Sequence, residues 1–286
     1  MKILVTGAAG LVGRSTIKFC QQNSDTVLAA TREQLDIADK ELVFAFLRRE
    51  KPDSVINCAA WTDVDGCETN FEKNFAANAL GVENLALGCR EINASLVTIS
   101  TDYVFDGAKN DFYTQRDDPN PQSKYAKAKL AGEHLAKNNL ARAIIVRTGW
   151  IFGDNGKNFL SKMPDLLFAG KKIKVIRDSS GTPTYAPDLA RRLRELAELD
   201  LPGIYHVTNA GDGTTYEGFA RAIENVDQSL IESVSFADLN RPAPRPQNSK
   251  LRCLISEKLG LEPLPHWKDA LRNFANSQKE QFENQS

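Results

Sequence analysis

The 286-residue sequence lacks both a charge imbalance and any long hydrophobic run. Its 36 basic and 37 acidic side chains leave a net charge of −1, so no excess of cations is available for nucleic acid or an anionic membrane surface. No stretch approaches the roughly 18 apolar residues of a membrane span. The apolar run 2–5 is too short and too soon followed by glycine to be a signal peptide. We therefore expect a cytoplasmic protein without nucleic-acid or membrane partners.

Residues that bind metals or form disulfides are also scarce. The five cysteines contain no C-x-x-C pair, and their odd number argues against a disulfide framework. Most of them lie in apolar, periodic segments, where cysteine acts as a small hydrophobic residue. The three histidines lie far apart and show no ligand spacing, so we expect no metal site.

The chain does contain a regular alternation of strand and helix patterns. A long helical pattern covers 70–91, and helical patterns also follow the first strand and precede the fifth. The strand patterns lie at 2–5, 26–30, 53–59, 94–100 and 142–147. Repeated β-α units with right-handed crossovers predict an α/β fold with a doubly wound parallel sheet, the Rossmann architecture. Ligands bind such sheets beyond the carboxyl ends of the strands.

The pattern becomes less regular after Trp150, and this change divides the chain. We predict a dinucleotide-binding Rossmann domain over 1–148 and a smaller C-terminal substrate-binding domain over 149–286. In this prediction a helix and a strand near 183–207 return to the main sheet.

A glycine turn joins the first strand to the first helix. Gly7, Gly10 and Gly13 follow the apolar run in the order strand, turn, helix that a dinucleotide fingerprint requires, although their spacing is one residue wider than G-x-G-x-x-G. Gly7 permits the tight turn, Gly10 lets backbone approach the pyrophosphate, and Gly13 permits close packing of helix on strand. The free N–H groups of the helix start favour an anion, so we predict a dinucleotide site.

The end of the second strand indicates which dinucleotide is preferred. An acidic residue there binds the ribose 2′-hydroxyl of NAD, whereas arginine accommodates the 2′-phosphate of NADP. The chain has Thr31 and Arg32, which favours NADPH, but Glu33 follows directly and keeps NADH open. Asp36 either flanks the adenine with Ile37 or caps the next helix.

A hydroxyl, a phenol and an ammonium group form a pattern suited to carbonyl reduction. Thr101 follows the strand 94–100, and Tyr125 and Lys129 lie four residues apart on a predicted helix, so they share one face. A free tyrosine titrates near ~10, and we expect the neighbouring cation to lower this pKa toward neutrality. The spacing Tyr-x-x-x-Lys is common by itself, and the glycine turn gives it weight.

Several motifs together resemble the extended short-chain dehydrogenase/reductases, and among them the dTDP-4-dehydrorhamnose reductase family. The resemblance covers about residues 1–274. Its most specific motifs are STDYVFDG at 100–107, YAKAKLAGE at 125–133, RTGW at 147–150, GKNF at 156–159, GTPTY at 181–185 and the segment 241–249.

The resemblance implies NAD(P)H-dependent reduction of the C4 ketone of a nucleotide-activated deoxysugar, in particular dTDP-4-dehydro-L-rhamnose, for polysaccharide synthesis. Thr101 would hydrogen-bond the ketone, Tyr125 would donate the proton, and Lys129 would hold the nicotinamide ribose. The expected cofactor contacts combine the positions that match the family's cofactor-binding residues with the glycine turn and Arg32. They are Gly7, Gly10, Leu11, Val12, Gly13, Thr31, Arg32, Asp36, Ile37, Ala59, Ala60, Trp61, Tyr125 and Lys129. The expected sugar-nucleotide contacts are Thr101, Asp102, Tyr103, Trp150, Asn158 and Arg245. A homodimer is one option for the oligomeric state.

Two departures from the family pattern leave the sugar open. Many relatives have serine in place of Gly149, and tyrosine or histidine in place of Trp61. Simpler roles also stay open: Trp150 as a core aromatic, Thr101 as a partner of backbone at a strand end, and Asp102 as a turn cap. The alternative functions are another reductase or epimerase of the extended family and an NADP-binding regulatory subunit without activity.

Overall fold

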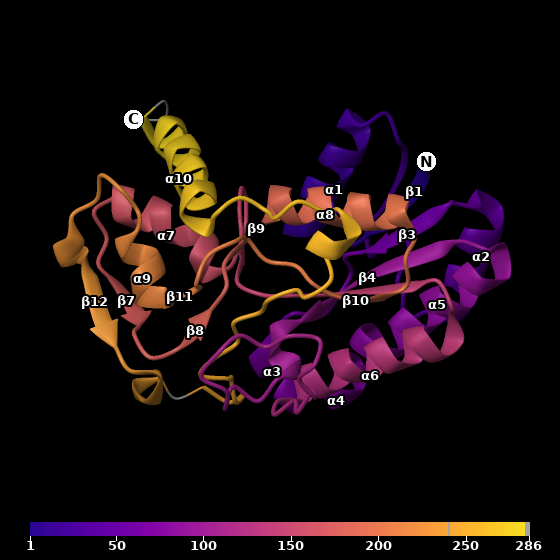
Figure 1. The fold of residues 1–286 in the computed structure, drawn as a ribbon, viewed down its shortest axis with the longest axis horizontal. Coiled ribbons are helices and arrows are strands. Elements are labelled where there is room, and N and C mark those ends of the chain that lie inside the picture. The colour runs from indigo at the N-terminus through magenta and orange to yellow at the C-terminus, as the bar shows by residue number, and fades with distance from the viewer. Residues whose placement is uncertain (240, 284–286) are drawn as a thin grey trace.

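The computed structural model describes residues 1–239 and 241–283. A six-stranded sheet with helices on both faces forms the larger part, and a smaller part of short strands and helices lies beside it (Figure 1). None of the helices in the described ranges is long and apolar enough to cross a membrane.

All pairings in the main sheet are parallel, in the order β10-β5-β4-β3-β1-β2. The strands are β1 (Lys2–Thr6), β2 (Thr26–Ala30), β3 (Ser54–Asn57), β4 (Ser95–Thr101), β5 (Ala143–Thr148) and β10 (Gly203–His206). From β1 the chain builds outward to β2 on one side and through β3, β4 and β5 on the other. The order therefore reverses between β1 and β3, where doubly wound sheets bind ligands. The predicted doubly wound parallel sheet is confirmed.

Helices cover the two faces of this sheet in two layers (Figure 1). One face carries α1 (Leu11–Gln22) and α8 (Ala186–Leu199), and the other carries α2 (Lys40–Glu50), α5 (Gly81–Ile92) and α6 (Lys124–Asn139). Alternate side chains of a strand point to opposite faces. Ile3 accordingly packs in the cluster that contains Leu189 of α8, and Leu4 packs in the cluster that contains Leu85 of α5. Burial on both faces explains the continuous apolar strands.

The predicted helix over 70–91 is present as a continuous helical stretch over 71–92, but its middle turn is π-helical. The structure contains α3 (Val64–Thr69), which the sequence analysis did not predict, then α4 (Phe71–Phe75), the π-helical turn η1 (Ala76–Leu80) and α5. Within η1, the buried Asn78 side chain bonds both backbone groups of Trp61, at 3.1 Å from its N and 2.9 Å from its O. Hydropathy periodicity does not register this change, because the π turn is a single turn inside a helix that continues on both sides.

The smaller part packs around aromatic side chains that include Phe152, Phe219 and Phe274. Its helices are α7 (Phe159–Phe168), α9 (Tyr216–Arg221) and α10 (Trp267–Glu283). Its strand pairs are β6 (Ile151–Phe152) with β9 (Thr184–Tyr185), β7 (Ile173–Ile176) with β12 (Ile231–Val234), and β8 (Ser180–Gly181) with β11 (Thr214–Thr215). Single 3-10 turns are η2 (Asp102–Val104), η3 (Gln228–Leu230), η4 (Phe236–Asp238) and η5 (Glu257–Leu259). The division at residue 148 into two functional domains stays a prediction.

Candidate active site

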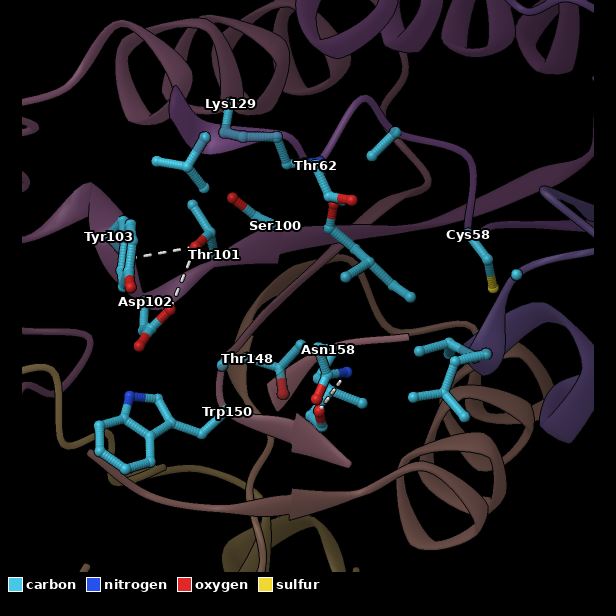
Figure 2. A pocket seen from close by; sticks show the side chains of 18 of the residues that line it. Cys58, Thr62, Ser100, Thr101, Asp102, Tyr103, Lys129, Thr148, Trp150 and Asn158 are labelled. Atoms are coloured by element: carbon cyan, nitrogen blue, oxygen red, sulfur yellow. Dashed lines mark hydrogen bonds between the residues drawn. The ribbon is translucent and has the colours of Figure 1, made fainter. Parts of the chain in front are cut away.

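A cavity of about 460 Å³ lies at the carboxyl ends of the central strands, with walls from both parts of the molecule (Figure 2). Most of the predicted site residues line it. They are Gly10, Leu11, Val12, Gly13, Ala59, Ala60, Thr101, Asp102, Tyr103, Tyr125, Lys129, Trp150 and Asn158. The predicted residues that do not line it are Gly7, Thr31, Arg32, Asp36, Ile37, Trp61 and Arg245.

The glycine turn at the end of β1 has the geometry expected of a pyrophosphate site. Gly7 has φ +65°, and a Cβ there would lie 2.7 Å from the backbone of Ala59. A Cβ on Gly13 would lie 2.2 Å from the Gly7 carbonyl oxygen. Gly10 is exposed, and a Cβ on it would meet only that same oxygen, at 3.2 Å. Gly10 precedes α1 without a side-chain cap, so N–H groups of the first turn are free for an anion.

The end of β2 lies outside the cavity. The Arg32 side chain is 74% exposed, and its Nε pairs with Asp36 Oδ2 at 3.2 Å. Asp36 Oδ1 accepts the Ala38 N–H, while the Asp39 side chain caps α2. The option that Asp36 caps this helix is therefore wrong. Ile37 is buried beneath Gly81 of α5.

Thr101 and Asp102 form the floor of the cavity where β4 ends. Thr101 Oγ1 donates to Asp102 Oδ1 at 3.1 Å and accepts the Tyr103 N–H at 3.2 Å (Figure 2). Thr101 therefore both caps the turn η2 and lines the cavity. The cap of this turn is Thr101 and not Asp102. Burial raises the pKa of Asp102 to about 6, although the neighbouring Ser249 and Thr101 hydroxyls favour its ionised form.

Tyr125 and Lys129 lie one turn apart on α6, and both are buried. The helix begins after Ser123, whose hydroxyl accepts the Ala126 N–H at 3.2 Å. Lys129 Nζ donates to the Ile99 carbonyl at 2.6 Å. Burial lowers the pKa of Lys129 to about 8, against the opposing effect of a nearby carboxylate, so its ammonium is still charged at pH 7.

The expected lowering of the Tyr125 pKa is wrong for this structure. Burial raises that pKa, the Asp102 carboxylate raises it further, and the Thr101 hydroxyl offsets only part of the rise. The Lys129 ammonium donates to the carbonyl of Ile99 and does not offset this rise. Tyr125 is consequently a neutral phenol at pH 7, which is the state that a proton donor needs.

A buried ion pair lies behind Lys129. Glu133, one turn further along α6, accepts two hydrogen bonds from Arg147 of β5, at 3.0 Å from Nε and 2.7 Å from Nη2. The Ser100 hydroxyl also donates to Glu133. This carboxylate supplies the opposing effect on the Lys129 pKa. Strand β4, strand β5 and helix α6 are thus tied together directly beneath the cavity.

The wall from the smaller part centres on Trp150. Its φ is +51°, its ring centroid lies 4.0 Å from that of Tyr216, and its Nε1 donates to Ser249 Oγ at 3.2 Å. Trp150 belongs to the core cluster of the smaller part and also lines the cavity, so the core role and the site role coexist. The Asn158 side-chain oxygen caps α7 by accepting the Ser161 N–H, and its side-chain nitrogen donates to the Ile151 carbonyl. Both ends of the Asn158 amide are therefore hydrogen-bonded within the protein.

Arg245 and Trp61 are two further predicted contacts that lie outside the cavity lining. Arg245 forms a bidentate ion pair with Asp65, at 2.8 Å and 3.0 Å. A lysine cation, Lys73 Nζ, lies 4.6 Å from the Trp61 ring centroid.

Comparison with known proteins agrees with this geometry. The family model described as RmlD substrate binding domain matches residues 1–280. The chain belongs to the RmlD family. A dTDP-4-dehydrorhamnose reductase of Mycobacterium tuberculosis is 38% identical over 94% of this chain and 91% of its own length. Spore coat polysaccharide biosynthesis protein SpsK of Bacillus subtilis is 38% identical over 96% of both chains. A solved dTDP-4-dehydrorhamnose reductase of Bacillus anthracis in complex with NADP superposes with a TM-score of 0.91, at 31% identity over 96% of this chain and 98% of that chain.

Tyr216 and Gly149 are among the cavity residues of this RmlD-family chain that the sequence analysis did not name as site residues. Tyr216 follows Thr215, the N-cap of a short helix, and no motif marks it. Gly149 was noted only as a departure from the family pattern, yet it lies directly against the Asp102 carboxyl. That departure was the one signal that could have pointed to it.

Proposed function

We propose that the protein uses NADPH to reduce the C4 ketone of a nucleotide-activated deoxysugar, with dTDP-4-dehydro-L-rhamnose as the preferred substrate. One observation carries the proposal: the hydroxyl of Thr101, the phenol of Tyr125 and the ammonium of Lys129 line one cavity together with the glycine turn. The family membership supports the same chemistry.

The residues present fit a dinucleotide. The uncapped start of α1 and the open space over Gly10 suit a pyrophosphate, and Arg32 at the end of β2 suits a 2′-phosphate. NADPH is thus preferred, with NADH as the alternative. The cofactor, when bound, supplies a hydride to C4 of the sugar.

Tyr125 supplies the proton that completes the reduction. Hydride at C4 and a proton on the carbonyl oxygen convert the ketone into an alcohol, so the phenol of Tyr125 leaves the step as a phenolate. The Thr101 hydroxyl has a single proton, which it donates to Asp102 in this structure. To orient the ketone, the hydroxyl turns this proton from Asp102 to the ketone oxygen. The charged Lys129 ammonium stabilises the phenolate and retains two N–H donors for ribose hydroxyls besides its bond to Ile99.

The smaller part supplies the sugar-nucleotide contacts in this proposal. Residues 1–148, with the return segments near 183–207, form the NADP(H)-binding domain, and the rest of 149–286 forms the substrate-binding domain. Trp150 and Asn158 of this part face the sugar, opposite Tyr103 of the larger part, and Arg245 would have to exchange Asp65 for a phosphate. The homodimer and the cytoplasmic location stay predictions.

The test is an assay of the purified protein with NADPH and dTDP-4-dehydro-L-rhamnose, followed by the loss of NADPH absorbance. We expect turnover with NADPH that exceeds turnover with NADH. NADPH binding without oxidation by this or related 4-keto sugars would contradict the proposal and favour the regulatory-subunit alternative.

A further inference from the structure

Glu133 lies behind the proposed active site without lining its cavity. It follows Lys129 by one turn of α6 and is 2% exposed, and its partner Arg147 on β5 is 3% exposed. Both carboxyl oxygens of Glu133 are occupied. Oε1 accepts from Arg147 Nε at 3.0 Å and from the Ser100 hydroxyl, and Oε2 accepts from Arg147 Nη2 at 2.7 Å. The proposed reduction steps use neither charge of this ion pair.

The end of β4 bonds α6 through two successive residues. The Ile99 carbonyl accepts from Lys129 Nζ at 2.6 Å, and the Ser100 hydroxyl donates to Glu133. Thr101 comes next and lines the cavity, and Figure 2 shows Ser100, Thr101 and Lys129 on the side opposite Trp150. The two bonds therefore fix the register of α6 against the strand end that carries Thr101.

Glu133 is also the charged group that favours the ammonium form of Lys129. Burial lowers the pKa of Lys129 to about 8, and the Glu133 carboxylate opposes that effect. Without this carboxylate, burial would act on Lys129 unopposed and would lower its pKa further. Lys129 would then lose its charge closer to neutral pH.

The other titratable groups around Lys129 keep a fixed charge from pH 7 to 9. On α6 and α3, burial holds the Tyr125 phenol and the Cys67 thiol neutral, and it raises the pKa of Cys67 to about 11. On β10, burial and the neighbouring guanidinium lower the pKa of His206 to about 4, so this ring is neutral too. At the end of β4, burial raises the pKa of Asp102 to about 6, so its carboxyl is ionised. Lys129 is therefore the group of this set whose charge changes over that range.

Arg147 holds Glu133 away from a direct pair with Lys129. The guanidinium and the Ser100 hydroxyl satisfy both carboxyl oxygens, and Lys129 forms no ion pair with Glu133 in the described part of the chain. A direct pair would use ammonium N–H groups that the proposed function assigns to ribose hydroxyls. We propose that Glu133 is a positioning residue for the reduction: held by Arg147 and Ser100, its charge keeps Lys129 protonated while two ammonium protons stay available.

The charge of Lys129 matters when Tyr125 gives up its proton, so the inference rests on the proposed function. The phenol O–H bond breaks, an O–H bond forms on the former carbonyl oxygen, and the phenolate keeps the electron pair. A charged Lys129 stabilises that phenolate, whereas a neutral amine does not. Glu133 exchanges no proton in this step, because it acts only through Lys129.

The first test compares Glu133→Gln, which removes the charge and keeps the side-chain length, with Glu133→Asp, which keeps the charge. NADPH affinity, measured by fluorescence titration from pH 7 to 9.5, should fall in wild type with a midpoint near pH 8. We expect this midpoint to move down by about one pH unit in Glu133→Gln and to stay within about 0.3 unit of wild type in Glu133→Asp. A purely structural role would lower the melting temperature of both variants and leave both midpoints near 8, which would overturn the inference.

A second variant keeps the test decisive if Glu133→Gln does not fold. Loss of Glu133 alone leaves the Arg147 cation buried without a partner, which destabilises a protein. Glu133→Gln combined with Arg147→Gln removes both charges, and its midpoint should shift in the same downward direction because the carboxylate is again absent. A midpoint equal to that of wild type in this double variant would overturn the inference.

Turnover provides the third measurement. At pH 8.5 the kcat of Glu133→Gln should be about tenfold below wild type, because less of its Lys129 is charged, and the gap should close to about twofold at pH 6.5. An equal gap at both pH values would overturn the inference. NADPH titration needs no sugar, so a wild type that binds NADPH but reduces no 4-keto sugar would refute the proposed function, while the midpoints would still decide whether Glu133 acts on Lys129.

Discussion

The two walls of the cavity are built in different ways. The wall from the main sheet places its groups by local rules: Thr101 at a strand end, and Tyr125 and Lys129 one turn apart on α6. The wall from the smaller part places Trp150 through contacts with Tyr216 and with Ser249, which lies 99 positions later in the chain. The groups proposed to carry the chemistry are therefore placed by short-range geometry, whereas the wall proposed to contact the sugar depends on long-range packing.

Tyr125→Phe should have the largest effect on turnover of these substitutions. It should alter only the cavity wall that the main sheet supplies. Removal of the proton donor lowers kcat by about 10²–10⁴-fold, the usual contribution of a general acid. Steady-state turnover and NADPH titration measure the two effects, and the Kd for NADPH should stay unchanged. Turnover that equals wild type would remove Tyr125 from the proton-donor role.

Lys129→Met should lower kcat/KM by about 10–100-fold, since it removes a charged hydrogen-bond donor. The pKa of Lys129 is lowered to about 8, so the ammonium is present below that pH and is lost above it. NADPH affinity of the wild type should consequently fall by about fivefold as the pH rises through 8, and fluorescence titration at several pH values measures this. A flat profile in Lys129→Met is the control; the same slope in both proteins would contradict the assignment.

Asp102→Asn tests the cost of the buried carboxylate at the junction of the two walls. Its pKa is about 6 in the folded protein and 3.8 without burial, so the carboxyl destabilises the fold progressively as the pH rises from about 4 to 6, and the loss reaches about 3 kcal/mol at pH 7. The variant should therefore unfold at higher urea concentration than wild type at pH 7. This difference should shrink as the pH falls from 6 toward 4, and it should vanish below the unperturbed value of 3.8, where both states are protonated. A pH-independent difference would show that Asp102 is not buried as a carboxylate.

Asn158→Ala should have the smallest effect of these substitutions, and we expect that effect to be a loss of stability in the smaller part. The variant loses the cap of α7, which costs about 1 kcal/mol in the free energy of unfolding. Asn158→Ser keeps a capping oxygen and should recover most of this loss in urea unfolding. Equal stability of the alanine and serine variants would mean that the cap contributes little.

The fold could be read from the sequence because its signals are local. Buried parallel strands appear as apolar runs, and the glycines of the turn are required by backbone contacts, such as the 2.2 Å that a Gly13 Cβ would leave to the Gly7 carbonyl oxygen. The same locality explains the predicted helix face of Tyr125 and Lys129. The π turn at 76–80 was missed because a single turn inside a helix leaves little trace in hydropathy, and the bonds of Asn78 to the Trp61 backbone form only in the folded chain.

Side-chain state was harder to predict than side-chain position. The Tyr125 pKa rises because the phenol is buried and the Asp102 carboxylate lies near it, and neither condition is visible in a four-residue spacing. Asn158 and Arg245 were expected to be free for a ligand, yet one caps α7 and the other pairs with Asp65. Such competition between partners depends on groups that the chain brings together from afar.

Spacing and local propensity were thus enough to specify the doubly wound sheet, the glycine turn and the shared face of the tyrosine and lysine, because each depends on residues within a few turns of one another. The raised pKa of Asp102, the closure of the cavity by Trp150 and Tyr216, and the need for glycine at position 149 arise only in the folded chain. The physical reason is that burial, unpaired oxygens and van der Waals exclusion are properties of atoms from separate segments in contact.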